Sequence, residues 1–162
     1  MGAVSVLIKP ASGRCDMRCE YCFYYDEIAN REIGDFGLMS LETLENIVKS
    51  VFTEADTGAT FSFQGGEPTV RGLDFFRELM SIERRLNTKG VPITNCLQTN
   101  GVRIDEQWAR FLGENGFLVG LSLDGPRAVH DRFRRHPDGR GSFAEVMRAA
   151  RLFEKHGVEY NI

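Results

Sequence analysis

The sequence has no apolar run near the roughly 20 residues that a membrane-spanning helix needs. Its N-terminus, Met-Gly-Ala-Val-Ser, lacks the charged segment and apolar core of a secretion signal. The 20 basic and 23 acidic residues are interspersed and leave a net charge of −3, so no basic stripe is available for a nucleic-acid backbone. These absences predict a cytoplasmic protein with neither a membrane nor a nucleic-acid partner.

Cysteine is also scarce, and its placement is uneven. Three of the four cysteines, Cys15, Cys19 and Cys22, fall within eight residues, whereas Cys96 stands alone in an apolar segment. This spacing is not that of a disulfide framework, and in a reducing cytosol clustered cysteines hold metal or carry out redox chemistry. We interpret Cys96 as a small buried hydrophobic residue.

The clustered cysteines have more than one interpretation. Three thiolates on one short loop can bind three corners of a four-iron cluster and leave the fourth iron open for a ligand. A structural zinc site needs four ligands, and no second pair of cysteines or histidines stands at matching spacing. A redox dithiol of Cys19 and Cys22 would leave Cys15 without a role. The loop therefore favours an iron–sulfur cluster with Cys15, Cys19 and Cys22 as its ligands.

Strand-like and helix-like segments alternate along the chain. Short β-branched or aromatic runs predict strands at residues 4–8, 60–63, 93–97, 117–123 and 158–162. Apolar residues three or four apart predict helices that start after Ser40, Gly72, Asp105 and Ser142. We expect Ser40 and Asp105 to cap their helices and Ser142 to form a capping box with Glu145. This order predicts an α/β fold with a mainly parallel sheet, either barrel-like or doubly wound.

The chain stops inside the fifth predicted strand. A natural domain seldom ends there, since the missing neighbours would leave an exposed sheet edge and an unfinished core. We expect residues 1–162 to be the front portion of a longer protein.

Polar loops follow the predicted strands, where sites gather in parallel α/β folds. They are Gln64-Gly65-Gly66-Glu67-Pro68-Thr69 after the second strand, Gln98-Thr99-Asn100-Gly101 after the third, and Ser122, Asp124 and Gly125 at the fourth. Paired glycines let a backbone approach a ligand closely. Taken alone, the glycine pair fits a tight turn equally well.

At the cysteine loop the sequence resembles the radical SAM superfamily, where SAM is S-adenosylmethionine. The signature of that superfamily is C-x3-C-x2-C with an aromatic residue, here Tyr21, before the last cysteine. The resemblance implies that Cys15, Cys19 and Cys22 hold a 4Fe-4S cluster whose open iron is chelated by SAM. It also implies that reductive cleavage of SAM supplies a 5′-deoxyadenosyl radical.

The glycine pair carries a second part of this resemblance. The stretch Gly65-Gly66-Glu67-Pro68 is similar to the GGEP motif of the superfamily. The similarity implies that Gly65, Gly66 and Glu67 bind the amino group of SAM.

Within the superfamily the chain resembles the anaerobic sulfatase-maturating enzymes of the radical SAM/SPASM group over essentially its whole length. The resemblance is carried by residues 7–12, 19–24, 63–69, 97–101 and 119–126. It implies a partial (β/α) barrel of the radical SAM type, with about four βα units and the start of a fifth strand. Further barrel units and a SPASM domain would lie beyond residue 162. The implied reaction oxidises an active-site Cys or Ser of a sulfatase to Cα-formylglycine.

The narrower resemblance also implies roles for individual residues. Ser122 and Arg134 would bind the ribose and carboxylate ends of SAM, and Tyr21 would border the adenine. Gln64 and Gln98 would face the peptide or the cofactor. The catalytic proton acceptor and the auxiliary 4Fe-4S clusters are expected outside this chain. The implied partners are a sulfatase polypeptide and an electron donor such as ferredoxin or flavodoxin.

Two other functions fit the same residues. Another SPASM-type maturase, which forms thioether cross-links or processes a quinone-cofactor peptide, would share this front half. A non-catalytic iron–sulfur or zinc-binding module would bind metal without cleaving SAM. At the residue level, Ser122 can simply fill space in a strand, Arg134 can be solvated, and Tyr24 and Tyr25 are expected to pack over the cysteine loop.

Overall fold

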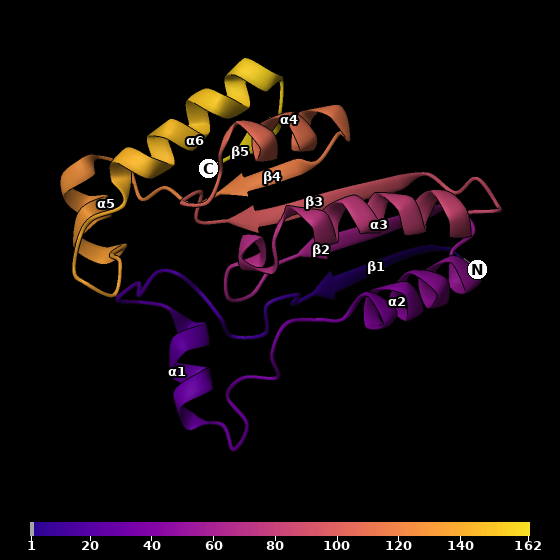
Figure 1. Cartoon of the computed structure of the whole chain (residues 1–162), viewed down its shortest axis with the longest axis horizontal. Coiled ribbons are helices and arrows are strands. Elements are labelled where there is room, and N and C mark those ends of the chain that lie inside the picture. The colour runs from indigo at the N-terminus through magenta and orange to yellow at the C-terminus, as the bar shows by residue number, and fades with distance from the viewer. Residues whose placement is uncertain (1) are drawn as a thin grey trace.

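The structure, a computed structural model, describes residues 2–162 apart from the side chain of residue 27, and it contains one parallel sheet of five strands. The strands are β1 (Ala3–Ile8), β2 (Gly58–Phe63), β3 (Ile93–Thr99), β4 (Leu118–Leu121) and β5 (Glu159–Asn161). They stand in the order β1-β2-β3-β4-β5, and every neighbouring pair is parallel. Each strand therefore returns beside the one before it, and all carboxyl ends meet at one edge of the sheet (Figure 1).

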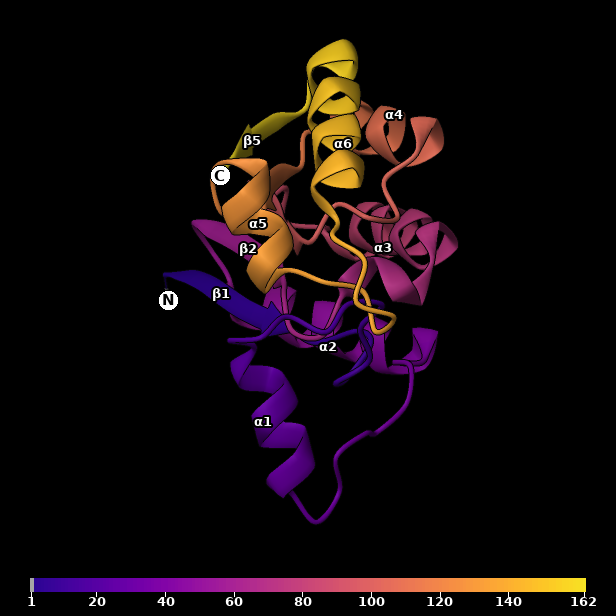
Figure 2. The ribbon, with the colours of Figure 1, turned by 90° about the vertical axis from the view of Figure 1, so that its left-hand side faces the viewer.

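Four helices connect consecutive strands and cover a single face of the sheet (Figure 2). They are α2 (Leu41–Glu54), α3 (Leu73–Leu86), α4 (Glu106–Glu114) and α6 (Phe143–His156). A doubly wound sheet would carry helices on both faces, so the barrel-like alternative is confirmed. The sheet is open, as expected of a partial (β/α) barrel.

Three short helical segments were not predicted. They are α1 (Phe23–Asn30), the 3-10 helix η1 (Pro68–Arg71) and α5 (Arg127–Phe133). Cys22 is the N-cap residue of α1, and its side chain makes no capping hydrogen bond, so the sequence lacks the usual start signal of a helix. It extends away from the sheet, whereas α5 lies near the carboxyl ends of the strands (Figure 1).

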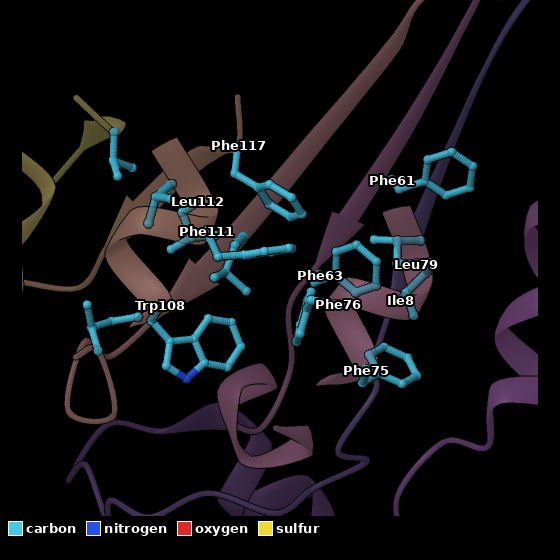
Figure 3. Packing of buried hydrophobic residues seen from close by; sticks show 14 of the residues in the cluster. Ile8, Phe61, Phe63, Phe75, Phe76, Leu79, Trp108, Phe111, Leu112 and Phe117 are labelled. Atoms are coloured by element: carbon cyan, nitrogen blue, oxygen red, sulfur yellow. The ribbon is translucent and has the colours of Figure 1, made fainter. Parts of the chain in front are cut away.

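The core lies between the sheet and its four covering helices. Alternate strand residues face inward, among them Phe61 and Phe63 of β2 and Leu97 of β3, all buried. Figure 3 shows Phe76 of α3 among these side chains, with its ring 5.1 Å from that of Phe63 and 5.3 Å from that of Trp108. Burying side chains of this size stabilises the fold by about 2 to 3 kcal/mol each.

The opposite face of the sheet has no covering helix and is largely polar. Ser62, Gln64, Cys96 and Gln98 line a hollow of about 180 Å³ on this face. The expectation that Cys96 is buried is wrong, because position 96 alternates out of the core and its side chain is only half-buried.

Two of the three predicted helix caps are confirmed, and the third is wrong. Ser40 accepts a hydrogen bond from Thr43 N, and Asp105 accepts one from Trp108 N, so both predicted caps are confirmed. The capping box of Ser142 and Glu145 is wrong, since the Ser142 side chain makes no capping bond.

Other side chains replace that capping box. The side chain of Asp131 accepts the hydrogen bond from Phe143 N at 2.8 Å. The Glu145 carboxylate instead contacts His136 Nε2 at 2.7 Å. Asp131 belongs to α5 and His136 to the loop after it, so a capping pattern within residues 142–145 does not predict either partner.

Glu83 of α3 is buried against Asn95 of β3. We expect this buried carboxyl to make the stability of the fold depend on pH. Asn95 Nδ2 donates to Glu83 Oε2 at 3.0 Å, while Glu83 Oε1 and Asn95 Oδ1 lack a partner among the described residues. Burial raises the pKa of Glu83 to about 7. A proton on the Glu83 carboxyl removes the negative charge that burial disfavours.

We expect the whole gene product to lose stability as the pH rises from about 5 to 7, because the folded carboxyl keeps a proton that the unfolded one releases. The loss is on the order of 2 to 3 kcal/mol. Thermal unfolding across this range should show a weaker pH dependence in Glu83→Gln than in Glu78→Gln, an exposed position on the same helix. Equal pH dependence in the two variants would contradict this account.

Candidate active site at the carboxyl ends of the strands

A cavity of about 300 Å³ lies where the strands end. It is lined by Cys15, Cys19, Tyr21, Cys22, Phe23, Tyr24, Gln64, Gly66, Glu67, Gln98, Thr99, Asn100, Ser122 and Arg134. Ten of the eleven residues predicted for the site are in this set, and Gly65 is the exception. A larger cavity of about 530 Å³ lies beside α1, but none of the three clustered cysteines lines it. The smaller cavity is therefore the candidate site.

The cysteine loop is held in place by backbone contacts on both sides. Met17, in the middle of the loop, is buried. Arg18 N donates to Arg135 O at 2.7 Å, and Glu20 N donates to Phe133 O at 2.8 Å. The loop thus pairs with the end of α5 and the residues just after it, more than a hundred residues further along the chain.

Burial makes the thiols of this loop hold their protons more strongly than exposed thiols do. Burial by surrounding atoms raises the pKa of Cys15 to about 12, although its side chain still reaches solvent. Burial also raises the pKa of Cys19, against the opposing charge of Arg134. A metal cluster would replace these protons with positive charge. Among the side chains that the structure describes, no three of His, Cys, Asp or Glu converge on one point. A four-iron cluster needs no such convergence, because each thiolate binds a different iron.

The glycine pair brings the end of β2 against the cysteine loop. Gly66 has φ 59°, and a Cβ there would lie 2.4 Å from Arg14 O. The next residue, Glu67, donates its N–H to that same carbonyl at 2.8 Å. A larger residue at position 66 would push the two loops apart, so glycine is required for this approach. Gly65 lies against the Lys9 side chain and outside the cavity lining.

The Glu67 carboxylate is buried and holds the ends of β2 and β3 together. Its Oε1 accepts hydrogen bonds from Thr69 N, Thr69 Oγ1 and Thr99 Oγ1, at 3.0, 2.7 and 2.8 Å. Its Oε2 accepts one from Asn100 N at 2.7 Å. Burial raises the pKa of Glu67, and these four donors oppose the shift. Both oxygens are thus engaged within the protein, and a contact between this residue and SAM remains a prediction.

Asn100 ties the end of β3 to the cysteine loop. Its Nδ2 donates to Asp16 Oδ1 at 2.8 Å and lies 3.8 Å from Cys15 Sγ. Arg103 Nε donates to the other oxygen of Asp16 at 2.7 Å. The sequence marks Asn100 only as a polar residue at a strand end, and its partner Asp16 lies 84 positions away.

Tyr21, Asp124 and Arg134 form a connected group at the end of β4. The Tyr21 hydroxyl donates to Asp124 Oδ2, and Arg134 Nε donates to Asp124 Oδ1 at 2.9 Å. Burial raises the pKa of Asp124, but the hydrogen bonds from Tyr21 and Arg134 lower it below its usual value. Partial burial and the bond to Asp124 raise the pKa of Tyr21 to about 12, so the phenol keeps its proton. The Arg134 side chain is 16% exposed and is not a solvated loop charge.

His130 anchors this group to α6. Asp124 N donates to His130 Nδ1 at 3.3 Å, while His130 Nε2 lies 2.9 Å from Ser142 Oγ. Ser142 Oγ in turn donates to Arg134 O at 3.0 Å, so the arrangement requires a neutral imidazole that donates from Nε2. Burial and the charge of Arg134 both lower the pKa of His130 and favour that neutral form. Asp124 was predicted only as a polar residue at a strand end, and His130 was not predicted at the site, because their partners become neighbours only through α5 and α6.

Ser122 and the two glutamines share the helix-free side of the site. Gln98 Nε2 donates to Ser122 Oγ at 3.1 Å, so Ser122 does more than fill space. A Cβ at Gly120 would lie 2.1 Å from Gln98 Oε1, and the missing side chain leaves room for the glutamine. Gln64 lines the same cavity from the end of β2.

A half-barrel sheet with three cysteines after its first strand and a glycine pair after its second defines a class of cluster-binding (β/α) proteins. The chain belongs to the radical SAM superfamily, whose sequence profile matches residues 10–162. The predicted superfamily is therefore confirmed. No helix within residues 2–162 has the length and apolar character needed to cross a membrane.

The relatives include sulfatase-maturating enzymes of two types. The chain is 49% identical over 162 residues to a cysteine-type anaerobic sulfatase-maturating enzyme of Clostridium novyi (strain NT), covering 100% of this chain and 43% of the relative. It is 36% identical over 157 residues to a serine-type enzyme of Bacteroides thetaiotaomicron, covering 96% of this chain and 38% of the relative. The chain thus spans less than half the length of these relatives.

A solved structure has the same fold as this chain over the whole length of this chain. The structure described as native anSMEcpe with bound AdoMet and Cp18Cys peptide has a TM-score of 0.92 and is 49% identical. The match covers 100% of this chain and 42% of that chain. The predicted resemblance to anaerobic sulfatase-maturating enzymes is confirmed.

Proposed function

We propose that residues 1–162 are the SAM-binding front portion of an anaerobic sulfatase-maturating enzyme, which oxidises a sulfatase side chain to Cα-formylglycine. The observation that carries the proposal is the convergence of ten predicted site residues on one cavity. The family match and the similarity to sulfatase-maturating enzymes over the whole chain support it. The remaining barrel units, the SPASM domain with its auxiliary clusters and the proton acceptor would belong to a later part of the protein.

Different residues of the cavity bind the cluster and SAM. Cys15, Cys19 and Cys22 hold the 4Fe-4S cluster through their thiolates. Bound SAM supplies, on one-electron reduction, a 5′-deoxyadenosyl radical that abstracts hydrogen from the substrate. Arg134 meets the SAM carboxylate, since a guanidinium matches its geometry, while Gly66 presents backbone to the SAM amino group.

The other cofactor contacts and the substrate contacts lie around the same cavity. Tyr21 borders the adenine, and Ser122 binds the ribose. Gln64 and Gln98 line the cavity and the adjoining polar hollow, so they meet the substrate peptide. The related anSMEcpe structure has a peptide, Cp18Cys, bound. We place the reaction in the cytoplasm, with ferredoxin or flavodoxin as the electron donor.

The identities of the relatives favour cysteine as the oxidised residue. The three cysteine-type relatives are 49 to 51% identical to the chain, whereas the serine-type relatives are 34 to 36% identical. We therefore expect a cysteine-containing sulfatase peptide to be the better substrate.

The proposal is tested by anaerobic incubation of the reconstituted whole gene product with SAM, a reductant and Cys- and Ser-containing sulfatase peptides. We expect 5′-deoxyadenosine and a formylglycine peptide, each detected by mass spectrometry. Release of 5′-deoxyadenosine with a different peptide product would instead assign another SPASM-type maturase. Failure to cleave SAM would overturn the proposal and leave a non-catalytic metal-binding module.

Asp124 provides a prediction at the cofactor site. In Asp124→Asn the neutral amide no longer balances the Arg134 charge, so the guanidinium loses its fixed orientation. We expect the dissociation constant for SAM to rise about tenfold, since a charged hydrogen bond is lost. Calorimetric titration of the cluster-loaded protein measures this constant.

Asp138→Asn is the matched control, because Asp138 also pairs with an arginine, Arg140 at 3.0 Å, but lies outside the cavity. It should leave the SAM affinity unchanged. An Asp124→Asn protein that binds SAM as tightly as this control would show that Asp124 does not position Arg134.

A further inference from the structure

A second hollow lies on the outer side of the cysteine loop. This groove of about 360 Å³ is lined by Arg18, Cys19, Glu20, Tyr25, Arg132, Phe133 and Arg135. Cys19 lines both the groove and the candidate site, so it separates the two. The groove therefore reaches from the protein surface to a predicted cluster ligand.

The groove carries unbalanced positive charge. Arg18, Arg132 and Arg135 are exposed, and within residues 2–162 none of the three forms an ion pair with a carboxylate. Glu20 is the one acidic residue among the described side chains that line the groove. The net charge of the whole chain is −3, so this concentration of arginine is local.

Aromatic rings and backbone bonds hold the arginines in place. The Arg18 guanidinium lies over the Tyr25 ring, 4.8 Å from its centre, and that of Arg132 lies 5.1 Å from the centre of the Phe133 ring. Arg135 Nε donates to a backbone carbonyl at 3.0 Å. The backbone pairing of residues 18 and 135 brings the charges of two distant segments together on one face.

From this arrangement we propose that the groove docks an acidic one-electron carrier protein, which reduces the cluster by way of Cys19. The inference rests on the proposed function, because that function needs an electron to cleave SAM. The carrier is oxidised by one electron and the cluster is reduced by one, with no proton or group transferred. Three unpaired arginines complement an acidic surface and raise its rate of encounter, whereas the rest of this acidic chain repels it.

The test compares two double variants of the cluster-loaded whole gene product. Arg18→Glu/Arg132→Glu inverts the charge of the groove and touches no carboxylate partner. Arg110→Glu/Arg151→Glu makes the same charge change on exposed positions of α4 and α6 that do not line the groove. Reduced flavodoxin is the probe, and photoreduced deazaflavin serves as a small reductant that needs no docking surface.

We expect flavodoxin to reduce the cluster of the cysteine loop at least about tenfold more slowly in the groove variant at low salt, as the growth of the SAM-sensitive electron paramagnetic resonance signal of that cluster reports. Calorimetric titration with oxidised flavodoxin should show weakened binding, and reduction by deazaflavin should be unchanged. The control variant should match the wild type in all three measurements.

Equal slowing of the two variants, an unaffected groove variant, or slower reduction of the groove variant by deazaflavin would each overturn the docking proposal. A wild type that holds a cluster but fails to cleave SAM with deazaflavin would overturn the proposed function instead. The two failures are therefore distinguishable.

Discussion

Cys19→Ala is expected to leave the whole gene product without its four-iron cluster, whereas Cys96→Ala should keep it. Cys19 lines the candidate site beside Arg134, whose Nη1 lies 4.0 Å from its sulfur, and three thiolates are the minimum that fixes an open-iron cluster. Cys96 is half-buried on the helix-free face of β3 and does not line that site. Iron and sulfide analysis after anaerobic reconstitution should show about four irons and four sulfides fewer per chain in Cys19→Ala than in Cys96→Ala, because the auxiliary clusters expected in the later part of the protein are kept.

The iron content of the Cys96→Ala control is as informative as the loss of iron in Cys19→Ala. Loss of iron in Cys96→Ala would mean that the ligand set has been assigned to the wrong cysteines. Retention of a full cluster in Cys19→Ala would carry the same meaning, since a loop with two remaining thiolates cannot hold three irons.

Glu67→Ala should be the most destabilising substitution at the site. The change leaves the four hydrogen-bonding groups of Thr69, Thr99 and Asn100 without their buried acceptor. Each unsatisfied buried donor costs about 1 to 3 kcal/mol, and we expect a total loss of about 3 kcal/mol or more. Chemical denaturation of the protein reports this loss.

Glu78→Ala is a suitable control because Glu78 is exposed on α3. It should change stability by less than about 0.5 kcal/mol. A Glu67→Ala protein as stable as this control, but with weakened SAM binding, would show that Glu67 contacts the cofactor and does not hold the strands together.

The order of elements was predictable because each depends on local sequence. Alternation at Phe61 and Phe63 indicates a half-buried strand, and the caps at Ser40 and Asp105 need only residues three positions away. The same local signals fit both a doubly wound sheet and a half-barrel. The choice between them depends on which face the helices cover, and this is a property of the whole sheet (Figure 2).

For the site, too, the local features were predictable from the sequence, and the contacts between distant residues were not. Cysteine spacing and the glycine pair mark the loops, and these loops do meet at one cavity. The supporting bonds were not predictable, since Asp124 meets Tyr21 across 103 positions and Asn100 meets Asp16 across 84. Ser142 shows the reverse error, because a strong local pattern suggested a helix cap where the side chain instead bonds His130.

The central claim is that the cysteine loop holds a four-iron cluster whose open iron binds SAM in the cavity at the strand ends. Electron paramagnetic resonance of the anaerobically reduced whole gene product, recorded with and without SAM, tests it most directly. We predict the signal of a reduced four-iron cluster that changes shape when SAM is added. A cluster signal that SAM leaves unchanged, or the absence of any cluster signal, would contradict the claim.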